Sequence, residues 1–315
     1  MKPTDDNVIL EPLDEETSRQ EYDEVKRKLD REWVIEDGNK SGYTVEDWGI
    51  NNATAKCYDL KSLMISFGTV TIRENPGKGD GGLQVLVFYS TNHKSYQLPK
   101  GRRNLDESAA DAALRETEEE TGVVVHPLYL VFDTRIQVGG DPAAHNGFVS
   151  NNANGTVTAV NRDIIYAMSY GDKKTQAYRH IYFYAAQPAE AGIREPDAAR
   201  LSDEDKSNRA RWFGIEEARK RLTMKAERAA VITAQILYER TRCNEGWWAL
   251  SNELLEKWKK ENSVRRLLMN QALAQAVVSD AKKAAILTAA IKEIVPNEAA
   301  RILEPLKQLK LNGRQ

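Results

Sequence analysis

The sequence predicts an α/β protein with additional segments at both ends. Strand patterns at 63–72, 83–90 and 178–186 surround a helix pattern at 109–121, so strands and helix alternate through the central part of the chain. From residue 247 onward the chain is instead rich in Ala, Leu, Lys and Glu and shows only helical patterns. We therefore expect a central α/β domain, an N-terminal extension and a helical C-terminal section.

Composition narrows the possible function classes. The chain has 315 residues, of which 41% are hydrophobic and 29% charged, and its net charge of −2 provides no global basic field for nucleic acid. Two cysteines, Cys57 and Cys243, without a Cys-x-x-Cys pair, argue against a structural zinc site. Residues 1–17 lack the apolar core of a signal peptide, and no long apolar run predicts a membrane span. We expect a cytoplasmic or nuclear protein without a membrane partner.

The first 59 residues are interpreted as an N-terminal extension. A helix is expected from Glu15 to Trp33, because Tyr22, Val25, Leu29 and Trp33 fall on one face. The Gly- and Asn-rich stretch 37–52 is expected to be a loop. The extension is therefore expected to pack on the central domain.

The first strands lead directly to the central helix. Residues 63–72 alternate between two faces, and the glycine-rich stretch 77–82 is expected to connect them to the next strand. Residues 83–90 are continuously apolar, which predicts a strand buried on both faces. A short strand at 96–98 then delivers the chain to Gly101.

The helix at 109–121 has clear start and stop signals. Ser108, three residues before Asp111, suits the N-cap, and Gly122 occupies the position of a left-handed C-terminal residue. Spacings of three and four place Ala110, Ala113, Leu114 and Thr117 on one face and Glu116, Glu119 and Glu120 on another.

Carboxylates crowded on one helical face repel one another and destabilise an isolated helix. A hard divalent cation such as Mg²⁺ or Mn²⁺ relieves that repulsion, because these ions take oxygen ligands and share them with substrate phosphates. A solvated acidic face is the alternative explanation for any run of glutamates. The ordered pattern around the run, with Glu107, Arg115 and Gly122 at fixed spacings, favours the metal site.

These residues resemble the Nudix box, which reads Gly, five residues, Glu, seven residues, Arg-Glu, an aliphatic residue, any residue, Glu-Glu, any residue, Gly and an aliphatic residue. Gly101, Glu107, Arg115, Glu116, Glu119, Glu120, Gly122 and Val123 occupy the corresponding positions. The one departure is Thr117 at the first aliphatic position, where a small, half-apolar side chain can still pack inward. Diadenosine polyphosphate hydrolases of the Nudix family often have threonine at this position.

The resemblance implies an α/β/α sandwich around a mixed sheet. It places the Nudix hydrolase domain at 60–242, with the closing strand and helix start at 211–222 and a last helix at 226–238. Within the domain, the Gly-, Asn-, Asp- and Ser-rich stretch 137–176 is expected to be a long insertion, either a functional lid or a disordered loop. The stretch 243–315 forms the helical C-terminal section.

By the same resemblance, the expected reaction is metal-dependent hydrolysis of a diphosphate linkage. Glu116, Glu119, Glu120 and the Gly101 carbonyl are the expected ligands of Mg²⁺ or Mn²⁺, and Arg115 is expected to hold the glutamates in place. The bound ions would neutralise phosphate charge and lower the pKa of a water molecule. The resemblance leaves the general base open between Glu119 or Glu120 on the helix and a glutamate elsewhere in the fold, for which Glu190, Glu195 and Glu204 are candidates.

Three cations flank the first glycine of the motif: Lys100, Arg102 and Arg103. Such a group suits a polyphosphate chain, although ordinary solvation of a loop is an equally good explanation for the two arginines. The expected substrate is a small, highly phosphorylated molecule, either a dinucleoside polyphosphate or an inositol pyrophosphate. The alternatives are an mRNA-decapping hydrolase, which the run Leu98-Pro99-Lys100-Gly101 also resembles, and a Nudix-fold binding protein.

The C-terminal section shows helical patterns at 250–260, 264–278 and 281–295, with a shorter one at 298–309. Its apolar positions must be covered, either within the chain or by a partner. Formation of a homo-oligomer through these helices is therefore one expected role.

Overall fold

The computed structural model describes residues 14–30, 62–75, 82–134, 145, 147–151, 156–172, 177–190, 196–203 and 205–269. In chain order the elements are α1 (Glu15–Asp30), β1 (Leu63–Glu74), β2 (Leu83–Ser90), β3 (Ser95–Gln97), β4 (Lys100–Arg102), α2 (Ala109–Thr121), β5 (Val125–Pro127), β6 (Leu130–Thr134), β7 (Phe148–Asn151), β8 (Val157–Asn161), β9 (Ile164–Gly171), β10 (Tyr178–Pro188), the 3₁₀ helix η3 (Ala198–Arg200), β11 (Arg209–Gly214), α3 (Ile215–Arg221), α4 (Lys225–Arg242) and α5 (Glu245–Met269). The chain divides into two compact units, Met1–Ser251 and Asn252–Gln315. No helix in the described ranges is both long and apolar enough to cross a membrane.

An eight-stranded mixed sheet forms the centre of the first unit. Its main order is β11-β2-β1-β10-β5, with β3 beside β2, β4 beside β1 and β9 beside β10. The pairing of β1 with β10 is parallel, whereas the other pairings in this sheet are antiparallel. The predicted mixed-sheet α/β fold is therefore confirmed.

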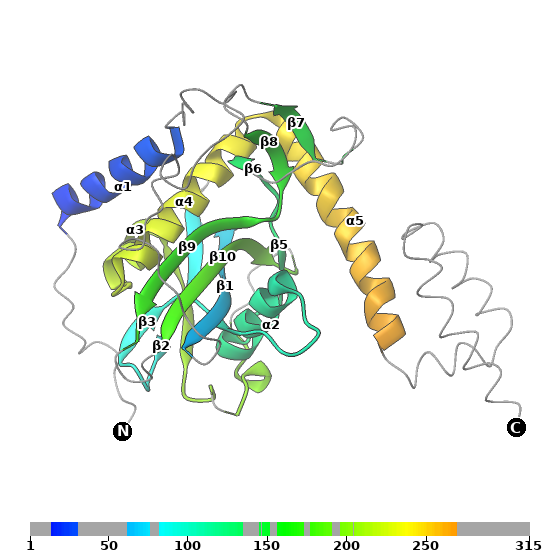
Figure 1. Ribbon diagram of the computed structural model, residues 1–315. Helices are drawn as coiled ribbons and strands as arrows, with labels where there is room; N and C mark the ends of the chain where they lie inside the picture. Colours follow the sequence, from blue (N-terminus) through cyan, green and yellow to red (C-terminus); the bar gives the residue numbers. More distant parts are fainter. Residues whose placement is uncertain are drawn as a thin grey trace, which may run out of the picture. The chain divides into compact units, whose positions relative to one another are not determined.

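Helices cover both faces of the sheet (Figure 1). The strict alternation of β1 sends Val70 and Ile72 into the core beneath α3 and α4, where they meet Ala218, Ala230 and other buried residues. The side chains of β1 that point to the opposite face of the sheet, such as Phe67, pack against the alanines of α2 instead. The central strand β2 is buried on both faces at residues 85–88, as its continuous apolar run predicts.

The stretch 137–176 differs from the expectation of a lid or disordered loop, because it contains three strands. β7 and β8 join β6 in a separate three-stranded sheet, and β9 pairs with β10 in the main sheet. Short strands with exposed polar positions are obscured by a Gly- and Asn-rich composition, and their stability depends on long-range pairing. Residues 137–144, 146, 152–155 and 173–176 lie outside the described ranges.

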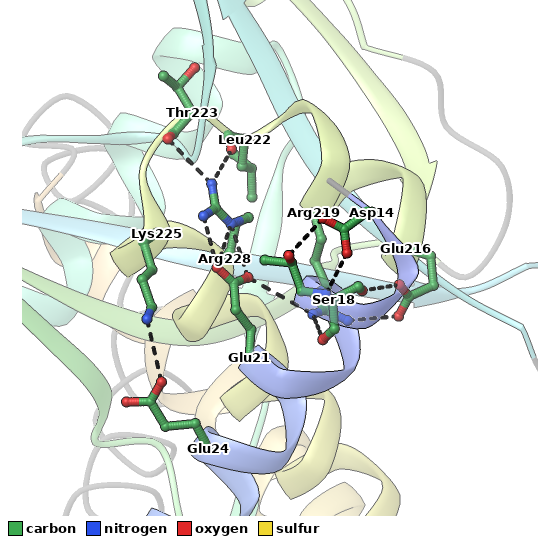
Figure 2. Close-up of polar contacts among 11 residues, drawn as sticks. Asp14, Ser18, Glu21, Glu24, Glu216, Arg219, Leu222, Thr223, Lys225 and Arg228 are labelled. Atoms are coloured by element: carbon green, nitrogen blue, oxygen red, sulfur yellow. Dashed lines mark hydrogen bonds and ion pairs between the residues drawn. The ribbon is translucent and has the colours of Figure 1, made fainter. Parts of the chain in front are cut away.

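The expected helix in the N-terminal extension forms as α1 and packs on α4. Val25 contacts Ile232 and Ile236 in a small apolar cluster. Beside that cluster, Arg228 donates hydrogen bonds to Glu21 over 2.8 to 3.2 Å, and Arg219 donates to the Ser18 carbonyl (Figure 2). These contacts attach α1 to α3 and α4.

In the C-terminal section, the patterns at 250–260 and 264–278 were expected to form separate helices. One helix, α5, instead runs without interruption from Glu245 to Met269. No Gly or Pro lies between 260 and 264, so the helix has no reason to stop there. Residues 270–278 of the second pattern and the patterns at 281–295 and 298–309 lie outside the described residues.

Candidate active site

The glutamate-bearing helix α2 begins and ends at the predicted residues. Ser108 accepts a hydrogen bond at Oγ from the Asp111 amide over 3.1 Å and donates to the Asp111 carboxylate over 2.7 Å. At the other end, Gly122 adopts a left-handed conformation with φ of 71° and donates its amide to the Glu118 carbonyl. The helix is thus fixed at both ends by local signals that are visible in the sequence.

Thr117, the departure from the motif, is fully buried beneath the helix. Its hydroxyl donates to the Ala113 carbonyl over 2.8 Å and lies 2.7 Å from Thr69 Oγ1, which in turn lies 2.7 Å from Thr71 Oγ1. Because the Thr117 hydroxyl already donates its proton to the Ala113 carbonyl, the Thr69 hydroxyl must donate to Thr117 Oγ1. The Thr71 hydroxyl must in turn donate to Thr69 Oγ1. This chain of hydroxyls satisfies a polar side chain at a position that is usually aliphatic.

Arg115 connects three glutamates of the motif. Its guanidinium contacts both oxygens of Glu107, and Nη1 donates to Glu116 over 2.8 Å and to Glu119 over 2.7 Å. Nη2 also donates to the Arg102 carbonyl over 2.9 Å, which ties the preceding loop to the helix. The hydrogen bonds from Arg115 are the main reason that the pKa of Glu107 is lowered.

Glu116 and Glu120 have raised pKa values because they are desolvated. Burial is the largest cause for Glu116, and the charges of Glu119 and Asp205 add to it, while Arg115 opposes the rise. For Glu120, burial raises the pKa to about 8 against the opposing charge and amide of Lys100. The Lys100 amide donates to Glu120 Oε2 over 2.7 Å. Two neighbouring carboxyl groups are therefore difficult to ionise together without a cation.

Strand β4 brings Gly101 directly against the glutamates. Gly101 pairs with Phe67 of β1, and a Cβ atom added to Gly101 would overlap the carboxylate of Glu116. Any larger residue would therefore displace that carboxylate. Glycine at this position allows the backbone of the strand to approach a motif glutamate closely.

The oxygen atoms of the predicted ligands are of the chemical type that a hard divalent cation binds. Carboxylate and carbonyl oxygens from Glu116, Glu119, Glu120 and Gly101 are the ligands that Mg²⁺ and Mn²⁺ prefer. A cation would also stabilise the ionised forms of Glu116 and Glu120, which burial disfavours. Within the part of the chain that the structure describes, no three acidic, His or Cys side chains are already gathered at ligating distances. The carboxylates are instead directed to Arg115 and to the Lys100 amide.

The three predicted substrate-binding cations are placed differently from one another. Arg102 and Arg103 are exposed beside Gly101, and Arg103 donates to the Glu107 carbonyl over 3.4 Å. The Lys100 side chain is instead only 11% exposed, and its ammonium lies 3.2 Å from Glu227 of α4. The structure therefore leaves the two arginines open to a ligand and gives Lys100 an internal partner.

The polar stretch between β10 and β11 contributes a carboxylate that the sequence interpretation missed. The charge of Asp205 raises the pKa of both Glu116 and Glu120, and its own carboxylate accepts from Ser202 Oγ and Asn208 Nδ2. The three-residue spacing of these partners is a turn signal, but it does not distinguish Asp205 from the acidic residues around it. Among the predicted alternative bases, Glu190 is exposed directly after β10, and Glu195 and Glu204 lie outside the described residues.

The fold and the site together define a class of protein: an α/β/α sandwich that carries a carboxylate site on a helix packed against a mixed sheet. Residues 64–235, more than half of the chain, match the model of the NUDIX domain family. The chain belongs to this family, whose members are generically pyrophosphohydrolases.

Several solved structures resemble the chain at low sequence identity. An Ap4A hydrolase from C. elegans is 14% identical, with coverage of 56% of this chain and 98% of its own and a TM-score of 0.34. A NUDIX hydrolase from Nitrosomonas europaea is 16% identical, with coverage of 55% and 88% and a TM-score of 0.32. The NUDIX domain of Shewanella oneidensis NrtR, in complex with ADP ribose, is 16% identical, with coverage of 57% and 92% and a TM-score of 0.35. No curated protein matches the chain significantly.

Proposed function

We propose that the chain hydrolyses a phosphoanhydride bond in a small, highly phosphorylated molecule, either a dinucleoside polyphosphate or an inositol pyrophosphate. The observation that carries this proposal is the cluster centred on Arg115, which gathers Glu107, Glu116 and Glu119 beside a loop with two exposed arginines. The intact set of glutamates favours an enzyme over a binding protein, because a binding protein has no need of all of them.

The residues have separate tasks in this proposal. Glu116, Glu119, Glu120 and the Gly101 carbonyl would hold Mg²⁺ or Mn²⁺, which supplies charge neutralisation at the phosphates and a more acidic water molecule. Arg115 keeps the carboxylates oriented, so little reorganisation is needed during the reaction. Glu119, Glu120 and Asp205 are the candidates for the group that accepts the proton of the attacking water.

Substrate preference is assigned to the exposed arginines. Arg102 and Arg103 flank the glutamate cluster, and guanidinium groups bind phosphate oxygens in a bidentate manner. A net charge of −2 offers no extended basic track for the backbone of an RNA chain. A compact molecule with several phosphates therefore suits the site better than capped RNA does.

The test is a panel of substrates assayed with equal Mg²⁺ and, separately, with equal Mn²⁺. It contains diadenosine polyphosphates, an inositol pyrophosphate and capped RNAs of two lengths, with nucleotide, phosphate and inositol products measured. Cleavage of the compact substrates supports the proposal. Cleavage of capped RNA alone, faster for the longer RNA, would assign the chain to decapping, and no cleavage of any substrate would favour a binding protein.

A double variant tests the two arginines. Arg102→Ala with Arg103→Ala should raise KM about tenfold or more while changing kcat less, because these groups bind phosphates away from the bond that breaks. The matched control replaces two exposed cations of α1, Arg19→Ala with Lys26→Ala, and should change neither constant. An equal effect in both double variants would mean that only the general charge of the protein matters.

A further inference from the structure

Lys100 contacts two glutamates on opposite sides of the sheet. Its backbone amide donates to Glu120 of α2 over 2.7 Å, whereas its ammonium lies 3.2 Å from Glu227 Oε1 of α4. The side chain also donates to Gln97 Oε1 over 2.8 Å and to the Leu98 carbonyl over 3.1 Å. One residue of β4 thus links the glutamate site with the helix on the other face.

Glu227 is a buried carboxylate with no part in the NUDIX motif. It lies in the first turn of α4, and its side chain is fully buried. Burial raises its pKa, and the charge of Lys100 is the largest influence that opposes this rise. Neither carboxylate oxygen has a hydrogen-bond partner among the residues that the structure describes, so the ion pair with Lys100 is the contact that compensates the buried charge. An ionised carboxylate at this depth is stable only if it keeps its partner, so Glu227 and Lys100 constrain each other.

Strand β4 is packed closely against β1, with which it pairs at Gly68. A Cβ atom at Gly68 of β1 would overlap the Pro99 carbonyl and approach Lys100 Cβ to 2.7 Å. Gly101, the residue after Lys100, is also close to its neighbour, because an added Cβ atom there would overlap the Glu116 carboxylate. A shift of Lys100 would therefore change the positions of a hydrogen-bond donor to Glu120 and of the backbone that contacts Glu116.

We infer that Glu227 is a positioning residue of the active site, which acts through Lys100 to hold β4 and, with it, Glu120 and Gly101 in register for the metal. This inference rests on the proposed function, since it concerns the same glutamates. It assigns the Lys100 side chain to the support of the site, in place of direct contact with substrate phosphates. Glu227, which lies more than 100 positions after the motif, thereby influences the geometry of the motif glutamates.

The chain offers a matched control pair at the next residue. Arg228 of α4 binds Glu21 of α1 over 2.8 Å, and the two side chains are 15% and 8% exposed (Figure 2). Arg228 also donates to the Leu222 carbonyl over 3.0 Å. This ion pair is likewise largely buried and uses the same helix, but the hydrogen bonds of Arg228 go to α1 and to the segment between α3 and α4.

The experiment compares Glu227→Gln, Lys100→Met and the double variant Lys100→Met/Glu227→Gln with Glu21→Gln. Mn²⁺ affinity is measured without substrate, and kcat and KM with the best substrate, well below the unfolding temperature of each variant. The two single variants should each weaken Mn²⁺ binding and lower kcat about tenfold, with KM changed less than about threefold. The double variant should recover most of both losses, because no unpaired buried charge remains.

The control separates positioning from stability. Glu21→Gln should lower the unfolding temperature about as much as Glu227→Gln, while its Mn²⁺ affinity and kcat stay within about twofold of the parent. If Glu227→Gln changes only the unfolding temperature, the inference is wrong. It is equally wrong if Lys100→Met raises KM alone and Glu227→Gln changes nothing, since Lys100 then meets phosphates directly.

The Mn²⁺ measurement also distinguishes this inference from the proposed function. A parent protein that cleaves no substrate refutes the proposed hydrolysis, but weaker Mn²⁺ binding by Glu227→Gln and its recovery in the double variant would still support the positioning role. A parent protein that binds no Mn²⁺ refutes both.

Discussion

Arg115 donates two hydrogen bonds to the carboxylate of Glu107, from Nε to Oε1 over 2.8 Å and from Nη2 to Oε2 over 2.9 Å. The remaining nitrogen, Nη1, is thereby directed at Glu116 and Glu119. This division of hydrogen bonds among three carboxylates requires a planar guanidinium group, whose donors are fixed relative to one another. Glu107, which lies before the helix, therefore orients the arginine that in turn orients the helical glutamates.

Arg115→Lys should reduce turnover about a hundredfold, because an ammonium group cannot bind both oxygens of Glu107 and still reach the other two glutamates. The measurement is kcat across a range of Mn²⁺ concentrations. Arg200→Lys is the matched control, since Arg200 binds Glu118 of the same helix over 2.7 Å. We expect less than a twofold change there, and a similar loss in both variants would contradict the role of Arg115.

Glu120→Gln should lower turnover about a hundredfold yet stabilise the metal-free protein at high pH. The substitution keeps the volume of the side chain and removes a charge that burial disfavours. We expect a gain of roughly 1–3 kcal/mol near pH 8, measured by denaturant unfolding with a chelator present. A variant that is destabilised at that pH would show that the ionised carboxylate is well accommodated.

The sign of this effect follows from the pKa of Glu120 in the unfolded and folded chains. The carboxyl group has its ordinary pKa of 4.5 when the chain is unfolded and a pKa of about 8 in the folded protein, so between these values the unfolded chain binds fewer protons. The contribution of Glu120 therefore lowers stability progressively as the pH rises from 4.5 to 8, and the loss is constant above that range. In Glu120→Gln this part of the pH dependence should disappear.

The sequence predicted the fold, the bounds of α2 and the face of its glutamates, because the signals for these features are local. The helix bounds follow from Ser108 and Gly122, and the helical face follows from the spacing of Glu116, Glu119 and Glu120. Thr117 was expected to pack inward, and the hydroxyl chain through Thr69 now explains how it does so. Such features depend on residues a few positions apart or on the regular pattern of a strand.

The remaining features depend on contacts between distant parts of the chain. The partner of Lys100 is Glu227, and no sequence pattern relates the two. The strands within 137–176 likewise depend on pairing with β6 and β10, which their composition does not indicate. Asp205 was missed for the same reason, because its distance from the glutamates is set by the path of the chain between β10 and β11.

Gly122→Ala should destabilise the protein by roughly 2–4 kcal/mol, for two reasons that add. The φ angle of 71° is unfavourable for any residue with a Cβ atom, and that atom would also overlap the backbone of Asp197. Gly214→Ala is the control, because nothing lies within 4 Å of the added atom and φ is −56°. Comparison of the two unfolding free energies tests this, and equal values would show that neither the left-handed backbone nor the overlap with Asp197 opposes a Cβ atom at residue 122.

Asp205→Asn should shift the pH dependence of Mn²⁺ binding toward lower pH. The charge of Asp205 raises the pKa of both Glu116 and Glu120, so its removal lets these groups lose their protons at lower pH. Because protons compete with the metal, we expect the acidic midpoint of Mn²⁺ binding to fall by about half a pH unit.

The control for Asp205 is Glu190→Gln, an exposed carboxylate beyond the end of β10. Its removal should leave the midpoint unchanged, because Glu190 is not among the charges that raise the pKa of Glu116 or Glu120. Asparagine keeps an oxygen that can accept from Ser202 or Asn208, so the turn around residue 205 should survive the substitution. A midpoint that stays the same in Asp205→Asn would place residue 205 too far from the glutamates to influence them, and would also remove it from the candidates for the general base.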